Sequence, residues 1–185
     1  MRFVTSAAAL GFAALVLGGC VQQPPPVVPT STPSVAPVFA SDADALAAAK
    51  KAYTGYLAAT DAVGNSGGVQ PDRMAPFVTA EWLPRELRDY ESLAKKGEKF
   101  RGRTSFTNFT LQSHDQSSTG IAQVEAYVCV DVSKSTLLDA KGRDITPATR
   151  INLIPAVVDF VGRTPHSSEL LLDGSEPWSG ANFCQ

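Results

Sequence analysis

The clearest pattern in the chain is an alternation of apolar and polar residues over positions 121–133. The apolar positions are Ala122, Val124, Ala126, Val128, Val130 and Val132, and the polar positions are Gln123, Glu125, Tyr127, Cys129, Asp131 and Ser133. Successive side chains of a strand point to opposite faces, so this stretch predicts a long antiparallel strand with two unlike faces. Only one of these faces can pack against helices.

Earlier in the chain, apolar residues recur at helical spacing. The positions that share one side of this predicted helix are Leu46, Ala49, Tyr53, Leu57 and Thr60. The Ser41 hydroxyl can cap the first turn, where the charges of Asp42 and Asp44 suit the helix dipole. The helix is expected to end before the glycine-rich segment 64–68, which is too flexible to continue it.

A second helical region is predicted over residues 71–97. Pro84 either interrupts it or starts a new helix, because proline fits the first turn of a helix but not its interior. Leu83, Leu87, Tyr90 and Leu93 then continue at helical spacing. This region is therefore expected to pack one apolar side against the rest of the domain.

Most of the remaining chain is typical of strands. Strands are expected at 100–114, at 149–161, and at 168–172 together with the region of Trp178, with a turn at 141–142. Two or three helices followed by long antiparallel strands indicate an α+β domain with a sheet of about four strands.

This layout resembles the nuclear transport factor two-like (cystatin-like) cone, in which N-terminal helices pack on a curved antiparallel sheet. More narrowly, the segment 127–133 with Gly142, Trp178 and Cys184 is similar to actinobacterial lipoproteins of that class. The resemblance implies one α+β domain over residues 41–185. It does not imply an activity, because such folds carry many functions.

The first residues resemble the leader of a bacterial lipoprotein. Arg2 precedes an apolar run at 3–17, which is too short to span a bilayer comfortably and is typical of a secretory signal. The run ends in Leu17-Gly18-Gly19-Cys20, which resembles a lipobox. The resemblance implies a signal peptide over 1–19 and a lipidated Cys20 that holds the protein on the extracytoplasmic face of the cell membrane. An ordinary signal peptide with a chance cysteine is the alternative.

A proline-rich segment separates Cys20 from the domain. Its prolines are Pro24, Pro25, Pro26, Pro29, Pro33 and Pro37. Proline removes the backbone donors that helices and sheets need, so residues 20–40 are expected to form an extended tether with a reach of about 60 Å. A ligand for a proline-binding domain is the sharper alternative, but no basic residue flanks the prolines.

The charge of the chain narrows the classes of partner that it can bind. The formal net charge of -2 gives no electrostatic footprint for nucleic acid. The densest basic cluster is Lys95, Lys96, Lys99, Arg101 and Arg103, which is interpreted either as contact with anionic lipid or as solvated cations near a helix C-terminus. The glycine-rich loop lacks the Lys-Ser/Thr pair of a phosphate loop, and no cofactor is expected.

Three cysteines occur in the chain. Once Cys20 is assigned to lipid by the resemblance, Cys129 and Cys184 remain as one possible pair. Paired thiols tend to oxidise outside the cell, so a disulfide is expected, with two buried free thiols as the alternative. The bridge would restrain the unfolded chain by roughly 4 kcal/mol.

Candidate chemistry lies on the polar face of the long strand. In cone-shaped relatives such as ketosteroid isomerase and the SnoaL-like cyclases, acids and tyrosines between sheet and helices transfer protons, and Glu125, Tyr127 and Asp131 share one face here. A solvated face is the competing interpretation. His114 and His166 are the only histidines, and their spacing from the cysteines matches no common metal site.

These observations leave three hypotheses. The first is a non-enzymatic binding or protein-interaction module on the cell surface, with an envelope protein as partner. The second is a binder of a small apolar or carbohydrate ligand in the cone, and the third is an isomerase- or cyclase-like enzyme that uses Asp131 or a neighbouring acid. The direction in which the valines of the long strand point separates them.

Overall fold

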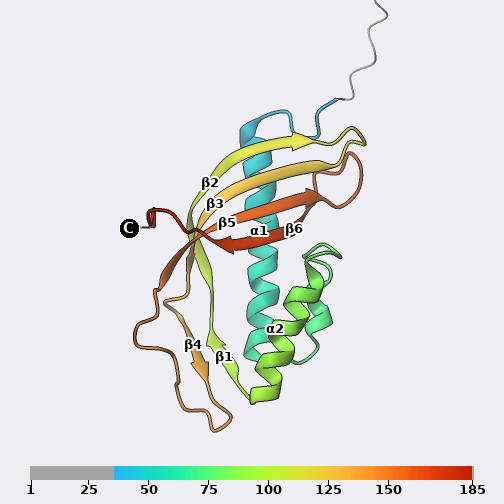
Figure 1. The fold of residues 1–185 in the computed structure, drawn as a ribbon. Helices are drawn as coiled ribbons and strands as arrows, with labels where there is room; N and C mark the ends of the chain where they lie inside the picture. Colours follow the sequence, from blue (N-terminus) through green and yellow to red (C-terminus); the bar gives the residue numbers. More distant parts are fainter. Residues whose placement is uncertain (1–35, 185) are drawn as a thin grey trace, which may run out of the picture. The chain divides into compact units, whose positions relative to one another are not determined.

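The computed structural model describes residues 36–184 of the 185-residue chain. The leader, Cys20 and most of the tether therefore lie outside the described residues. Over the described part the chain is an α+β domain, in which two α-helices pack on a curved antiparallel sheet of four strands (Figure 1). This is the fold class that the sequence predicts.

The helices come first. Helix α1 spans Asp42–Asn65 and helix α2 spans Leu83–Lys96, with a short 3-10 helix, η1, at Pro71–Met74 between them. The Ser41 hydroxyl accepts a hydrogen bond from the backbone N–H of Asp44, so the predicted cap is present. Helix α1 runs two residues beyond the predicted end, since Gly64 and Asn65 remain helical.

Helix α2 resolves the two options for Pro84. The proline lies in the first turn of α2, where its missing N–H costs nothing, so it starts a new helix. Gly97 ends the helix in the left-handed conformation, with φ at 66°.

The strands form two sheets. The main sheet has the order β2-β3-β5-β6, with β2 at Ser105–Gln116, β3 at Ala122–Asp131, β5 at Leu153–Gly162 and β6 at Leu170–Pro177. All three pairings within it are antiparallel. A two-stranded ribbon pairs β1 at Lys99–Gly102 with β4 at Ser135–Leu138.

Two strand predictions need correction. The strand expected over 100–114 is divided into β1 and β2, because the chain turns sharply at Gly102, where φ is 118°. A β-carbon at this position would lie against the carbonyl oxygen of Lys134, so only glycine fits. The strand expected from residue 149 begins at Leu153 instead, since the chain turns at 147–150 and the Arg150 side chain is bound to the carbonyls of Val132 and Ser135.

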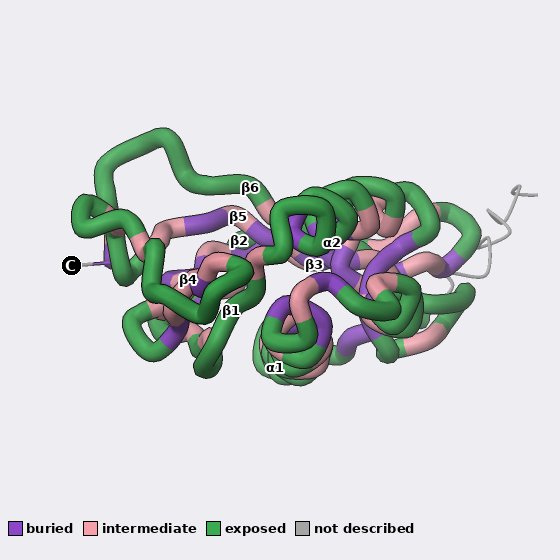
Figure 2. Tube along the Cα trace, turned by 90° about the horizontal axis from the view of Figure 1, so that it is seen from below, coloured by how far each residue is buried: buried purple, intermediate pink, exposed green. Residues whose placement is uncertain are grey.

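The core lies between α1 and the concave face of the sheet (Figure 2). Tyr53 of α1 is almost fully buried, and its ring meets those of Phe106, Phe109 and Phe160 within 6.3 Å between centroids. Burying each such aromatic ring contributes on the order of 2 kcal/mol from area alone. This ring cluster fixes the sheet on α1.

The domain begins earlier than the predicted boundary at Ser41. Phe39 is buried, and the backbone N–H of Val38 donates to Oε1 of Gln116 at 2.8 Å. The predicted tether extends to residue 40, because Phe39 follows a proline-rich segment and no repeated pattern marks it as a core residue. Within residues 36–184, no helix has the length and apolar character to cross a membrane.

Candidate functional site

The valine face of β3 packs inward. Val124, Ala126 and Val128 are buried in the core against α1. Glu125, Tyr127 and Asp131 therefore lie on the outer face of the sheet, away from the space between sheet and helices. The arrangement needed by the enzyme hypothesis, in which these three side chains line that space, is not the one observed.

The C-terminal tail covers part of this outer face. Cys129 and Cys184 form a disulfide, as the sequence predicts, between residues 55 positions apart. The ring of Tyr127 stacks on Phe183 at 5.5 Å and lies 5.1 Å from that of Trp178. Tyr127 is thus the base of an aromatic cluster rather than a free phenol in a pocket.

The two acids lie in separate surroundings. Glu125 and Asp131 are six positions apart on β3, about 20 Å along an extended strand. Hydrogen bonds from Ser133 hold the pKa of Asp131 below its usual range. Glu125 faces Asp159 across the sheet, where desolvation, followed by repulsion from Glu125 and Asp173, raises the pKa of Asp159. The three residues do not converge on one reacting centre.

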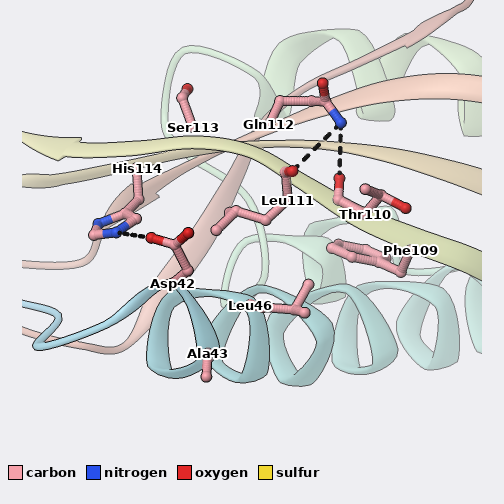
Figure 3. Close-up of a pocket in the computed structure, with 9 residues that line it drawn as sticks. All are labelled: Asp42, Ala43, Leu46, Phe109, Thr110, Leu111, Gln112, Ser113 and His114. Atoms are coloured by element: carbon pink, nitrogen blue, oxygen red, sulfur yellow. Dashed lines mark hydrogen bonds and ion pairs between the residues drawn. The ribbon is translucent and has the colours of Figure 1, made fainter.

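His114 lies at a groove between α1 and the edge strand β2 (Figure 3). Its Nε2 lies 3.0 Å from Oδ1 of Asp42 in the first turn of α1. The neighbouring Ser113 points away from this pair, so no nucleophile accompanies it (Figure 3). The pair links the sheet to the start of α1. Within residues 36–184, no three His, Cys, Asp or Glu side chains gather as a metal site.

A cavity of about 340 Å³ remains between the C-terminal half of α1 and the sheet. Its apolar and aromatic walls are Tyr53, Tyr56, Leu57, Phe100, Val130, Val132 and Ile154, and its polar lining is Thr60, Asp61, Thr104, Ser135, Arg150 and Ser175. Such mostly apolar cavities with a few fixed polar groups are where proteins hold small ligands.

Arg150 is the cation of this cavity. One of its terminal nitrogens donates to the Ser135 carbonyl at 2.8 Å, and the other donates to the Val132 carbonyl at 3.0 Å. Among residues 36–184, no carboxylate lies within ion-pair distance of this guanidinium. Its Nε–H is buried and donates to no acceptor of the described chain. The charge is fixed in position but has no paired anion.

Asp61 is the cavity's carboxylate. Its two oxygens accept from the backbone N–H of Thr104 at 3.1 and 3.0 Å, which fixes the β1–β2 connection to α1. Tyr56 also borders the cavity, and its hydroxyl donates to Glu86 at 2.8 Å. Burial, then the nearby Glu86 charge and this hydrogen bond, raises the pKa of Tyr56, so its phenol stays neutral.

Sequence reasoning missed this cavity and Arg150. Val130 and Val132 were placed on the apolar face of β3, but alternation does not reveal which part of that face is left uncovered by α1. Arg150 falls inside a predicted strand, and no sequence pattern indicates that its side chain binds the β3–β4 turn. A lone cation between Thr149 and Ile151 was the one available signal.

The comparisons with known proteins concern the fold. No family model matches the chain, and no curated protein matches it in sequence. Among solved structures, the intermembrane space region of the chloroplast protein ARC6 is similar, with a TM-score of 0.53 and 12% sequence identity. The match covers 73% of this chain and 97% of that chain. At this identity the likeness shows a shared arrangement of helices and strands and nothing about activity.

Proposed function

We propose that this chain is a lipid-anchored, extracytoplasmic binding protein that holds a small ligand between α1 and the concave face of the sheet. The observation that carries the proposal is the cavity beside Tyr53 and Val132, with its apolar walls and its fixed, unpaired Arg150. Catalysis by the outer-face acids is not part of the proposal, because Glu125 and Asp131 lie apart and outside this cavity.

The anchoring part of the proposal rests on the sequence. The Leu17-Gly18-Gly19-Cys20 segment after a short apolar run supports lipidation of Cys20, and the prolines after it support a spacer. A curved sheet around a long first helix supports membership of the nuclear transport factor two-like class. A disulfide between Cys129 and Cys184 suits an oxidising compartment.

An interaction with an envelope protein is the second candidate. The aromatic cluster of Tyr127, Trp178 and Phe183 lies on the outer face and leaves Trp178 exposed, as is common at binding surfaces. The neighbouring Leu153 is also exposed. This surface is separate from the cavity, so one protein can serve both roles.

Ligand binding in the cavity is tested with a neutral naphthalene amide, 2-naphthamide, added to the purified full-length chain. Ile154→Phe fills the cavity and should abolish binding measured by calorimetry. Ile151→Phe is the matched control, because Ile151 is exposed outside the cavity and the same change there should leave binding intact. Equal binding by all three proteins would remove the cavity from the proposal, and so would a parent chain that binds neither 2-naphthamide nor its charged analogue 2-naphthoate.

The anchor is tested in intact bacterial cells. The parent chain should incorporate an alkyne-labelled fatty acid and sediment with membranes, whereas Cys20→Ala should lose both the label and the sedimentation. Cys184→Ala serves as the cysteine control and should retain the label. A Cys20→Ala chain that still carries the label would show that another residue is modified.

A further inference from the structure

We propose that the ligand of the cavity carries one carboxylate on an apolar body, with the carboxylate bound by Arg150. This inference rests on the proposed function, since it names the chemical class that the same cavity would take. The group of the lining that determines this class is the guanidinium of Arg150.

Within residues 36–184 the guanidinium of Arg150 forms no ion pair with a carboxylate. A cation that is partly removed from water is costly unless an anion or several hydrogen bonds compensate it. Two backbone carbonyls and the Asn152 side chain hold it, but these acceptors are neutral. The nearby Asp144 carboxylate accepts from the backbone N–H of Thr146 and forms no ion pair with it. An incoming anion would supply the missing charge.

The geometry of the guanidinium favours a carboxylate. Three N–H donors of its planar fork are engaged by Ser135, Val132 and Asn152, which leaves the buried Nε–H and one terminal N–H for an anion. Charge-assisted bonds from these donors to carboxylate oxygens are stronger than neutral hydrogen bonds. The backbone carbonyls of Val132 and Ser135 hold the fork in place before a ligand arrives. Little conformational entropy is then lost when the anion binds.

The walls define the rest of the ligand. Phe100, Val132 and Ile154 offer no hydrogen-bond partners, so a polar body would lose its hydration without replacement. Tyr53 and Tyr56 stack on each other at 5.8 Å, and their rings add an aromatic surface to the same wall. A cavity of about 340 Å³ suits a body of one or two rings or a short chain.

Asp61 limits the charge of the ligand to a single negative unit. This carboxylate lines the same cavity and is fixed by Thr104. Arg150 can pair with one negative charge, whereas the second charge of a phosphate dianion or a dicarboxylate would have no cation and would be repelled by Asp61. A monocarboxylate is therefore the class that the lining favours.

The test compares two probes of equal shape and different charge, 2-naphthoate and 2-naphthamide, by calorimetry on the full-length chain at pH 7. We expect 2-naphthoate to bind at least tenfold more tightly than 2-naphthamide. Arg150→Gln should remove this difference by weakening 2-naphthoate alone. Lys141→Gln, which removes a positive charge from an exposed position of the same loop, is the matched control and should keep the difference.

Arg150 also clamps the β3–β4 turn, so its variants need a check on folding. Circular dichroism establishes whether Arg150→Gln keeps its fold, and Arg150→Lys decides the question if it does not. Lysine keeps the charge but not the fork, so it should retain only part of the preference for 2-naphthoate. A full preference in either folded variant would overturn the role of Arg150.

Asp61→Asn tests the charge limit. It should tighten 2-naphthoate severalfold by removing repulsion, and a loss of affinity would overturn the monoanion assignment. Equal binding of the two probes by the parent chain would overturn the carboxylate class and leave the proposed cavity intact. If neither probe binds, both the inference and the cavity function fail.

Discussion

The two halves of the interface between α1 and the sheet differ in how closely they are packed. At the first half, Ala45 and Ala49 of α1 and Ala122 and Ala126 of β3 are all fully buried. At the second half, Val130 is only partly buried and borders the cavity. One strand with one unbroken alternation thus contributes to a closed core and to an open site.

Side-chain size explains the difference. Small side chains on both partners allow a helix and a sheet to approach closely. Farther along α1 the sheet gives way to the β1–β4 ribbon, and the cavity opens beside Tyr53 and Leu57. The closed half supplies stability, and the open half can accept a ligand without sacrificing it.

The largest expected effect comes from a large-to-small change in each half. Phe160→Ala in the closed half should lower the free energy of unfolding by about 3–5 kcal/mol, because the ring is buried within the aromatic cluster around Tyr53. Ile154→Ala beside the cavity should cost only about 1 kcal/mol, since Ile154 is partly buried and borders the cavity. Urea unfolding measures both. Equal losses would mean that the two halves are equally packed.

Loss of the disulfide, which lies on the outer face of the sheet, should lower the free energy of unfolding by a similar amount. Replacing Cys129 and Cys184 together by serine should cost roughly 4 kcal/mol, since the bridge closes a loop of 55 residues in the unfolded chain. It should also free the tail and expose Tyr127. Chemical denaturation with and without a reductant measures the loss. The reductant should lower the free energy of unfolding of the parent chain to that of the double variant. An unchanged unfolding midpoint in the double variant would contradict the expectation.

The smallest effect is electrostatic and lies on the outer face. Because the pKa of Asp159 is raised in the folded state, the folded chain binds this proton more tightly than the unfolded chain does, and stability falls as pH rises above the ordinary range of an aspartate. Asp159→Asn should therefore stabilise the protein by a few tenths of a kcal/mol at pH 7 and by nothing near pH 3. Thermal unfolding at both pH values checks this, with Asp72→Asn as an exposed control outside this group of acids. An Asp159→Asn variant that is less stable than the parent chain at pH 7 would contradict the expected direction.

The sequence predicted local structure well wherever a repeated pattern controlled it. The cap at Ser41, the helix stop at Gly97 and the two faces of β3 follow from turn chemistry and periodicity. The break at Gly102 was missed, because its positive φ depends on the approach of Lys134 in the distant β3–β4 turn. Tertiary contacts of this kind leave no trace in neighbouring residues.

The candidate site was less accessible to prediction. The disulfide was found because cysteines are few, and the polar face of β3 was found because it alternates. Which face points inward depends on the packing of α1, and the role of Arg150 depends on carbonyls contributed by the β3–β4 turn. Both are properties of the assembled fold.

The way in which residues 38 and 39 are attached to the domain has a mechanical consequence. The chain enters the domain at Val38 and Phe39, which are fastened to Gln116 and to the core beside the first turn of α1. The cavity borders residues 53–61, farther along a helix of about 36 Å. Pulling on residue 36 would load the β2 edge and the start of α1 first. A force applied to the domain through residue 36 would therefore make it yield at one end while its cavity keeps its shape at the other.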